Sequence, residues 1–354
     1  MRPIRVFLGG YINSTNAQNL NCLALARHLD RKRFRVGALH LYSGDLPLEG
    51  ELVKKTRLFR TFRPHRFSRY LAYWRGIFWA DVVYLPKGEI CGWNHFWIRL
   101  LGKKSFRTVE GIYGEEMLAQ LLRGQKSYEA FLRSLRRYDR LYSITRFLAE
   151  YNRTRHGIVT EEKILYLGTE TSLFANPDKE HKGLREIVFV GRLKKRKGVY
   201  DILALARRFP GLTFHLVGDG EERESLEKTV ATEGLKNVRL HGMLSHARLA
   251  ELLKRMDLHL FPSRSEGFPK VTLETAAAGV PSLVYSDYGA DEWIDHGTDG
   301  FVVDTLEEMA SILRTLLDDP ERLRSLSRNA MRMAERFDWK NLIKDWEQVI
   351  EELH

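Results

Sequence analysis

Aliphatic runs and amphipathic stretches alternate along the second half of the chain, a pattern that predicts parallel β-α-β units. Most of the short aliphatic runs end in a loop that contains glycine or proline, and apolar residues then recur at helical spacing, as in 199–208. Strands buried on both faces read as continuous aliphatic runs, whereas the helices that cover them have a period of 3.6 residues. We therefore expect roughly six strands, at 187–190, 212–217, 238–241, 258–261, 282–285 and 301–303.

Residues at the expected helix ends support this organisation. Gly234 is placed to end one helix, because glycine adopts the left-handed conformation of a C-cap at little cost. Ser245 can cap a helix over 247–255 through its side-chain oxygen. Asp319 and Pro320 are expected to open a final helical tail.

The first half repeats the same order less clearly. An apolar strand at 4–8 runs into Gly9 and Gly10, and a helix at 16–29 follows. Because strand, glycine and helix recur in both halves, we expect an α/β protein with two Rossmann-like doubly wound domains facing across a cleft. We expect further strands at 36–42, 82–85, 107–109 and 140–144, and an inter-domain connector at 164–175.

Composition changes this picture through the distribution of charge. The 354 residues are 44% hydrophobic and 29% charged, the balance of a globular protein, and no apolar run is long enough to span a membrane. Two cysteines predict a reducing compartment, and we read the N-terminus as a strand, not as a signal peptide. Residues 1–168 hold 30 lysines and arginines against 14 acidic residues, so the first half is expected to meet an anionic partner.

Two loops that follow expected strands carry residues suited to a diphosphate. After 187–190, Arg192 and Lys197 bracket a strand-to-helix turn that ends in Gly198, and cations beside a helix N-terminus favour phosphate. A solvated basic loop is the alternative. Gly218 and Gly220 form a second turn, which a simple strand-to-helix connection explains equally well.

The third loop, residues 262–281 (PSRSEGFPKVTLETAAAGVP), is the most specific feature of the sequence. Glu266 lies in the loop, and Glu274 is expected about one turn into the following helix, roughly 6 Å along its axis. One carboxylate could meet a sugar while the other reaches a ribose, with backbone N–H groups directed at a diphosphate between them. The less favoured interpretation is that the loop glutamate and the small-residue helix after it serve packing alone.

These strings resemble family-four retaining glycosyltransferases, which have the GT-B fold. The spacing Glu266-x7-Glu274 with Ala-x-Gly-x-Pro after it resembles the signature of that family, and Gly-Arg-Leu-x3-Lys-Gly resembles its diphosphate loop. The resemblance is specific over 164–346 and weak over 1–163. It implies an N-terminal acceptor domain at 1–168, a nucleotide-sugar domain at 169–337, and a helix at about 338–354 that packs back onto the first domain.

The resemblance also implies roles for matching positions. Arg192 and Lys197 would neutralise the leaving nucleoside diphosphate without a metal, and Glu266 would hold hydroxyls of the transferred sugar as the third catalytic residue. Met243 and Leu244 would lie near the base. The donor-binding positions implied are Gly10, Gly191, Gly218, Met243, Leu244, Gly267, Phe268, Pro269, Lys270, Val271 and Glu274.

Two positions depart from the family pattern. Pro269 stands where glycine is common and has no N–H to offer to a donor. A Thr-Val-His stretch that often supplies a histidine to the active site reads Thr108-Val109-Glu110 here, so Glu110 is the candidate on the acceptor side.

The implied reaction is retaining, metal-independent transfer of a hexose-type sugar from a nucleotide-diphosphate donor, a UDP- or GDP-sugar, with no other cofactor. The sequence supplies no positioned nucleophile of the double-displacement kind. Alternatives are a sugar-nucleotide epimerase of the same fold, a phosphorylase, and a non-catalytic basic adaptor. The last would leave the Glu266 and Lys197 motifs without a purpose.

Residues 52–80 combine basic and aromatic side chains without any acidic residue. Between Lys54 and Trp79 lie eight lysines or arginines and eight aromatic residues, and Arg99, Lys103, Lys104 and Arg107 are expected to extend the patch. Anionic membrane docking, a packed core with solvated arginines, and nucleic-acid binding are the three interpretations. We favour the membrane over nucleic acid. A lipid-linked or glycolipid acceptor in cell-envelope polysaccharide or glycolipid synthesis, and a cytoplasmic, peripheral location on the inner membrane face, follow as expectations.

Overall fold

The computed structural model describes residues 2–113 and 127–354, and the chain divides into two compact units. The N-terminal unit comprises Met1–Leu167 and Trp339–His354, and the C-terminal unit comprises Gly168–Asp338. The boundaries expected from the sequence, after residues 168 and 337, each lie within one residue of these.

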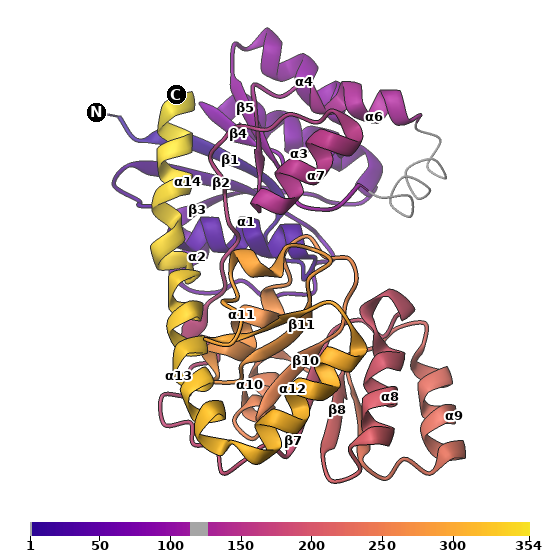
Figure 1. Cartoon of the computed structure of the whole chain (residues 1–354). Helices are drawn as coiled ribbons and strands as arrows, with labels where there is room; N and C mark the ends of the chain where they lie inside the picture. Colours follow the sequence, from indigo (N-terminus) through magenta and orange to yellow (C-terminus); the bar gives the residue numbers. More distant parts are fainter. Residues whose placement is uncertain (1, 114–126) are drawn as a thin grey trace. The chain divides into compact units, whose positions relative to one another are not determined.

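The N-terminal unit is built on a six-stranded parallel sheet in the order β3-β2-β1-β4-β5-β6 (Figure 1). β1 pairs with β2 on one side and β4 on the other, so the chain reverses its direction of winding between β1 and β4. The strands are β1 Ile4–Tyr11, β2 Phe34–His40, β3 Thr56–Arg60, β4 Val82–Tyr84, β5 Lys104–Val109 and β6 Arg140–Ser143.

The C-terminal unit repeats this topology. Its parallel sheet has the order β12-β11-β10-β7-β8-β9, so the switch in winding falls between β7 and β10. Both orders are those of nucleotide-binding doubly wound sheets, which bind ligands at the carboxyl ends of the strands that flank the switch. The strands are β7 Glu186–Val190, β8 Thr213–Val217, β9 Val238–Gly242, β10 Leu258–Phe261, β11 Ser282–Tyr285 and β12 Gly300–Val303.

Helices cover both faces of each sheet. In the N-terminal unit they include α1 Ala17–His28, α2 Glu51–Lys55, α3 His65–Trp79, α4 Cys91–Leu100, α6 Tyr128–Leu135, α7 Arg146–His156 and α14 Trp339–Leu353. In the C-terminal unit they are α8 Val199–Arg208, α9 Arg223–Glu233, α10 His246–Leu253, α11 Lys270–Ala277, α12 Leu306–Asp318 and α13 Pro320–Arg336, with 3-10 turns at Thr171–Leu173, Lys195–Lys197 and Ala290–Glu292.

The predicted fold class, α/β with two Rossmann-like doubly wound domains, is confirmed. The helix at 199–208 and the caps at Ser245 and Gly234 are also confirmed: the Ser245 side chain accepts a hydrogen bond from the Arg248 amide, and Gly234 has left-handed geometry. Sequence reasoning missed β3 and α3, which both lie inside the basic, aromatic stretch. No helix in the described ranges is both long and apolar enough to cross a membrane.

The last helix, α14, belongs to the core of the N-terminal unit, where it lies beside α1 (Figure 1). Trp346 is fully buried, and its ring lies 5.4 Å from that of Tyr84 and 6.4 Å from that of Phe106. Polar contacts add to this packing. The Glu347 carboxylate accepts hydrogen bonds from the Asp30 amide at 2.8 Å and from the Arg33 guanidinium at 2.8 Å.

We expect Trp346→Ala to destabilise the N-terminal unit by about 3–5 kcal/mol, since it leaves a large cavity beneath the sheet. Urea unfolding followed by circular dichroism measures this loss. Lys344→Ala, at an exposed position of the same helix, is the matched control and should unfold like the wild type. Equal stability of the Trp346 variant and the control would show that α14 does not contribute to this core.

Candidate functional site

Two loops of the C-terminal unit meet at the switch point of its sheet. One follows β7 and contains Arg192, Lys197 and Gly198, and the other follows β10 and contains Glu266. Because β7 and β10 are parallel neighbours, their carboxyl ends bring these loops together although they lie about seventy residues apart in sequence. Both loops were predicted to carry the chemistry, and the sheet places them side by side.

Close backbone packing fixes how the two loops approach each other. Gly198 has φ +69°, and a Cβ atom at this position would lie 2.0 Å from the Pro262 carbonyl oxygen. Gly218, at the end of β8, has φ +135°, and a Cβ there would lie 1.9 Å from the Gly191 carbonyl oxygen. Glycine is therefore required at both positions, for left-handed backbone and for space. These contacts hold the ends of β7, β8 and β10 at one level.

Hydrogen bonds tie the first loop to the second. The Arg264 amide donates to the Arg196 carbonyl oxygen at 3.0 Å, and the Arg196 guanidinium donates to the Ser265 carbonyl oxygen at 2.9 Å. Sequence reasoning named neither Arg196 nor Ser265 as a site residue, because their partners are distant in the chain and the bonds involve backbone oxygens that no motif marks.

Lys197 and Glu266 form an ion pair at the centre of this junction. The Lys197 ammonium donates to Glu266 Oε1, and the two side chains are only 13% and 11% exposed. The Ser263 hydroxyl donates to the same carboxylate oxygen, and Lys197 lies 5.3 Å from the centroid of the Phe261 ring. Ser263 and Phe261 were not predicted, although both stand within five residues of Glu266.

The surroundings of Lys197 favour an additional anion. Burial lowers the pKa of the Lys197 ammonium from its ordinary value, Glu266 opposes that shift, and the nearby positive charges of Arg196 and Arg192 lower it further. Three cations thus face one carboxylate. A group with two negative charges placed there would relieve this repulsion, and the side chain of Arg192 is exposed.

The second glutamate of the motif lies on α11, one turn from its start. Pro269 occupies the N-cap position, and Lys270 and Val271 form the first turn. Glu274 is partly exposed, and burial of its carboxyl raises its pKa, an effect that His246 and Lys270 oppose. A carboxyl with a raised pKa beside a helix start is typical of a ligand site rather than of a solvated surface.

The residues between the two glutamates anchor the loop. Phe268 is buried, with its ring 4.8 Å from that of Trp293 and 5.8 Å from that of Phe337. Its side chain is therefore part of the core, so any ligand contact at Phe268 falls to its backbone. Gly267, which precedes it, is half-buried beside Glu266.

The other predicted donor positions of this unit surround the same edge of the sheet. Gly191 follows β7 and donates its amide to Val217 at 2.9 Å. Met243 and Leu244 follow the edge strand β9, and Met243 is the more exposed of the two. Gly218 has the structural role described above, which agrees with the simpler interpretation of its turn.

Gly10 and Glu110 lie in the N-terminal unit, near the carboxyl ends of β1 and β5. Gly10 is buried against Cys22 of α1. Glu110 accepts hydrogen bonds from Thr108 at 2.6 Å, Tyr84 at 3.3 Å and Asn21 at 3.3 Å. The structure thus holds a carboxylate firmly at the switch edge of this sheet.

The basic, aromatic stretch divides into core and surface. Phe59 and Tyr73 are buried, as the packed-core interpretation expects, whereas Phe67 and Phe78 of α3 are 62% and 60% exposed. Arg107 was expected to extend the patch, and this was wrong, because its side chain is buried on β5 at only 8% exposure. Within residues 2–113 and 127–354, no group of three or more His, Cys, Asp or Glu residues is arranged to hold a metal ion.

An aromatic cluster joins α3 to α4 on the outside of the N-terminal unit. The Tyr70 and Trp93 rings lie 5.4 Å apart, and the Trp74 and Trp97 rings 6.0 Å apart. Further neighbours extend the cluster along both helices. We define it as Tyr70, Trp74, Phe78, Trp93, Phe96 and Trp97.

Curated proteins match part of this chain. Glycogen synthase of Mycobacterium tuberculosis is 34% identical over 175 residues, covering 47% of this chain and 42% of that protein. α-D-kanosaminyltransferase of Streptomyces kanamyceticus is 32% identical, covering 48% of each chain. The chain thus spans less than half the length of these curated relatives.

Solved structures resemble the chain over nearly its whole length. HepE of Anabaena, in complex with UDP and glucose, has a TM-score of 0.76 at 18% identity and covers 99% of this chain and 100% of its own. Sucrose-phosphate synthase of Thermosynechococcus elongatus has a TM-score of 0.79 at 17% identity, covering 99% of each chain. These likenesses confirm the predicted GT-B fold.

The family model described as glycosyl transferases group 1 matches residues 174–333, which contain all three loops at the switch point of the second sheet. Over these residues the C-terminal unit of this chain is similar to the group 1 glycosyl transferases.

Proposed function

We propose that the chain is a retaining glycosyltransferase that moves a sugar from a nucleotide-diphosphate donor to an acceptor hydroxyl without a metal. The observation that carries this proposal is the Lys197–Glu266 pair at the β7–β10 switch point, inside a group 1 glycosyl transferase domain. Lysine, two neighbouring arginines and the start of α11 suit a diphosphate, while a carboxylate beside them suits sugar hydroxyls.

The reaction follows from these roles. The bond between the anomeric carbon and the diphosphate oxygen breaks, and a bond from the acceptor oxygen to that carbon forms on the same face. The acceptor proton passes to the departing phosphate oxygen. Lys197 and Arg192 stabilise the negative charge that develops on the leaving group, which is the main contribution the protein can make to such a step. Glu266 orients the sugar through its hydroxyls.

A nucleoside diphosphate sugar is the donor class that the relatives support. HepE was solved with UDP and with UDP-glucose, and the relatives named above are a transferase and synthases. They give the epimerase alternative no support. On this basis we assign a UDP- or GDP-sugar to the C-terminal unit, with no other cofactor.

We assign the acceptor to the N-terminal unit and infer that it is lipid-linked, in polysaccharide or glycolipid synthesis at the cytoplasmic membrane face. Phe67 and Phe78 are eleven residues apart on α3, or three helical turns, so they share one side of the helix. Phe96 and Leu100 of α4 are also exposed. Exposed aromatic side chains beside arginines are suited to an anionic bilayer surface, where each cation contributes about 1 kcal/mol.

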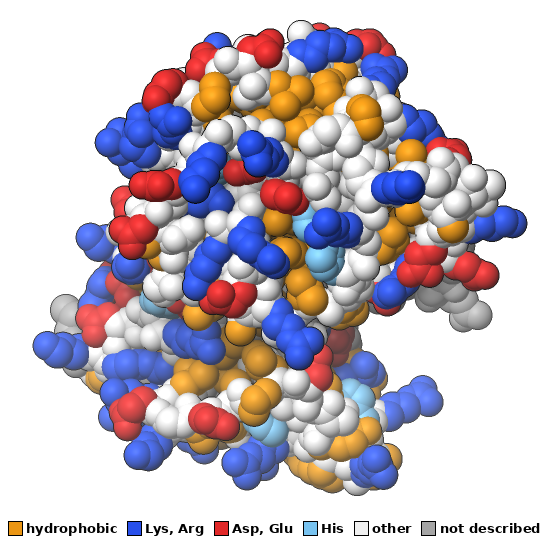
Figure 2. All heavy atoms as spheres, turned by 90° about the horizontal axis from the view of Figure 1, so that it is seen from below, with side chains coloured by type: hydrophobic (Ala, Val, Ile, Leu, Met, Phe, Trp, Pro, Cys, Tyr) orange, Lys and Arg blue, Asp and Glu red, His pale blue; other side chains and the backbone are white. Residues whose placement is uncertain are grey.

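Charge in the second half of the sequence is more evenly mixed, since residues 169–354 hold 27 lysines and arginines against 32 acidic residues. Figure 2 shows one face on which lysine and arginine side chains are spread across the whole view and alternate with acidic side chains. Segment 52–80, by contrast, has eight basic residues and no acidic one. We therefore take the α3–α4 region as the membrane-facing surface.

Lys197→Ala should lower transfer of sugar by about 100-fold or more while leaving the protein folded, since it removes a cation aimed at the leaving group. A nucleotide present at 100 times its dissociation constant should stabilise the wild type by about 2.7 kcal/mol, and Lys197→Ala should lose this thermal stabilisation. UDP and GDP are screened without added metal. Lys195→Ala removes an exposed cation from the same loop and is the control. Wild-type turnover by Lys197→Ala would refute the assignment.

Glu274→Gln should stabilise the protein at pH 8 and weaken nucleotide binding. The pKa of Glu274 is raised by burial, so the carboxyl favours the folded state while protonated, and this contribution is lost as pH rises through the folded-state pKa. Glutamine stays neutral at every pH. The difference in melting temperature between variant and wild type should thus grow from pH 4 to pH 8. A difference that shrinks over this range would contradict the expected environment of Glu274.

Replacing Phe67 and Phe78 with serine should weaken binding to anionic vesicles by about tenfold, because two exposed apolar side chains are removed from the bilayer-facing side. Co-sedimentation with vesicles containing phosphatidylglycerol, compared with purely zwitterionic vesicles, measures this effect. Leu173→Ser is the control, since Leu173 is 55% exposed but lies in the C-terminal unit. Equal and negligible binding of the wild type to both vesicles would exclude membrane docking.

A further inference from the structure

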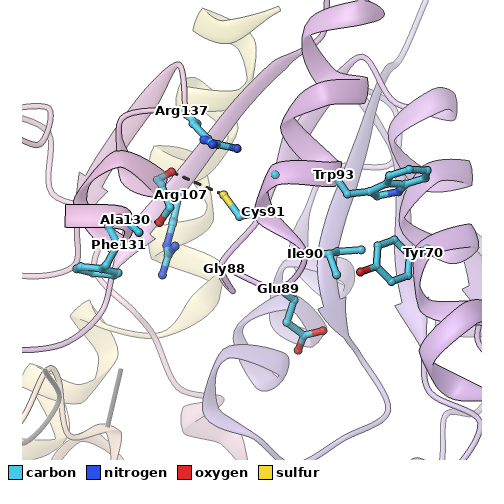
Figure 3. A pocket seen from close by; sticks show the side chains of 12 residues that line it. Tyr70, Gly88, Glu89, Ile90, Cys91, Trp93, Arg107, Ala130, Phe131 and Arg137 are labelled. Carbon is cyan, nitrogen blue, oxygen red and sulfur yellow. Dashed lines mark hydrogen bonds between the residues drawn. The ribbon is translucent and has the colours of Figure 1, made fainter. Parts of the chain in front are cut away.

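A cavity of about 710 Å³ lies within the N-terminal unit, between the end of β4, the start of α4 and α6. Figure 3 shows two arginines, Arg107 and Arg137, on one side of it and the rings of Tyr70 and Trp93 on the other. None of its lining residues belongs to the donor site of the C-terminal unit. The cavity thus combines a cationic wall with an aromatic one.

Arg107 is the buried cation of this cavity. Its side chain extends from β5 into the space between Phe131 and Gly88 (Figure 3). The Nε atom is buried and, within the described residues, has no hydrogen-bond partner. Burial lowers the pKa of the Arg107 guanidinium, and Tyr113 and Tyr138, the latter also through a side-chain hydrogen bond, raise it; neither tyrosine carries a negative charge at neutral pH. No carboxylate in the described part of the chain pairs with Arg107, and a guanidinium at 8% exposure is costly to bury unless an anion joins it.

The N-terminus of α4 is a second feature of the cavity that favours an anion. The helix begins at Cys91, and its N-cap residue Ile90 makes no side-chain cap and has left-handed backbone at φ 41°, a strained conformation for a β-branched residue. Cys91 and Gly92, in the first turn of α4, line the cavity, and the N–H groups of a first turn have no partner within the helix. The helix dipole adds partial positive charge there.

Arg137 lies over this helix start. Its Nη1 atom is 3.3 Å from the position that a Cβ of Gly92 would take. A cation beside the positive end of a helix is unfavourable, unless an anion lies between them. Glu89 also lines the cavity, but its carboxylate points away from both arginines (Figure 3) and lies 4.0 Å from Arg69.

We propose that this cavity binds a phosphate or diphosphate group of the acceptor, held by Arg107, Arg137 and the first turn of α4. This proposal rests on the proposed function in one respect, which is that the ligand is identified as part of the acceptor. Tyr70 and Trp93 belong both to the cavity wall and to the aromatic cluster of α3 and α4. An acceptor with an anionic group in the cavity can therefore continue onto an apolar surface, as a lipid-linked diphosphate would. A soluble phosphorylated acceptor shares the same anion chemistry.

Calorimetric titration with three probes tests the proposal: inorganic pyrophosphate, farnesyl diphosphate below its micellar concentration, and farnesol. We expect both diphosphates to bind and farnesol to bind at least tenfold more weakly, because the charged group is the determinant. Tighter binding of farnesyl diphosphate than of pyrophosphate indicates a lipid-linked source, and equal binding indicates a soluble one. Farnesol that binds as tightly as farnesyl diphosphate would overturn the proposal.

Variants locate the binding. Arg137→Gln should weaken both diphosphates by about tenfold, since a charge-assisted hydrogen bond is lost. Gly92→Asp places a carboxylate where the anion would lie. This change suits the helix start and should leave the fold intact, so it keeps the test valid even if Arg107→Gln fails to fold. Arg99→Gln, at the other end of α4 and outside the cavity, is the control and should bind within about twofold of the wild type.

One further variant separates this site from the donor site. Because the donor site of the C-terminal unit is itself proposed to hold a diphosphate, the titrations are repeated in the Lys197→Ala background, where Gly92→Asp should still remove the remaining diphosphate binding. Complete loss of binding in Lys197→Ala alone, or binding by a folded Lys197→Ala/Gly92→Asp double variant equal to that of Lys197→Ala, would overturn the cavity as the site. Failure of the donor proposal has a different signature, since it would abolish the UDP or GDP shift and leave the diphosphate titration as it was.

Discussion

The reversal of winding between β7 and β10 determines where charge can gather in the C-terminal unit. The connections that follow these two parallel strands go to opposite sides of the sheet. This opens a space at the carboxyl ends of the strands, and both connecting loops border it. Gly198 and Gly218 let the loop backbones approach more closely than any side chain would permit. Lys197 and Glu266 meet in this space, nearly shielded from water. A pair of this kind gains little stability from its own attraction, because desolvation of both charges opposes it. Its presence among two further cations is better explained by a ligand than by folding.

The C-terminal unit could be predicted in detail because its signals are local. The aliphatic runs that became β7 and β10, the caps of α10 and α9, and the helix α8 each depend on a few consecutive residues. Lys197 and Glu266 could be assigned to one site without knowing any contact, since the carboxyl ends of adjacent parallel strands share an edge. Ser263 and Arg196 could not be found in this way. Their contacts depend on which loop atoms face each other, and sequence spacing does not contain that information.

The N-terminal unit was harder to predict because one segment serves both core and surface. Thr56–Arg60 mixes basic with apolar residues and forms β3, yet its composition resembles that of the helix that follows. Phe59 and Tyr73 are in the core, while Phe67 and Phe78 are outside, a distinction that follows from the helix period only once the bounds of α3 are known. Ile90, whose left-handed backbone starts α4, carries no residue type that would signal such a turn.

Burial of Arg107 changes how the positive charge of the first half should be understood. Counted along the sequence, every arginine contributes equally to an attraction for anionic surfaces, and Arg107 stood among those expected at the membrane. In the fold it faces inwards, on β5, where a lipid headgroup on the outer surface of α3 and α4 would not reach it directly. The rings of Tyr70 and Trp93 line the same cavity as Arg107 and also belong to the exposed aromatic cluster. An acceptor with both an apolar chain and an anionic group would use each in turn, which is why the cavity and the aromatic cluster are more informative together than either is alone.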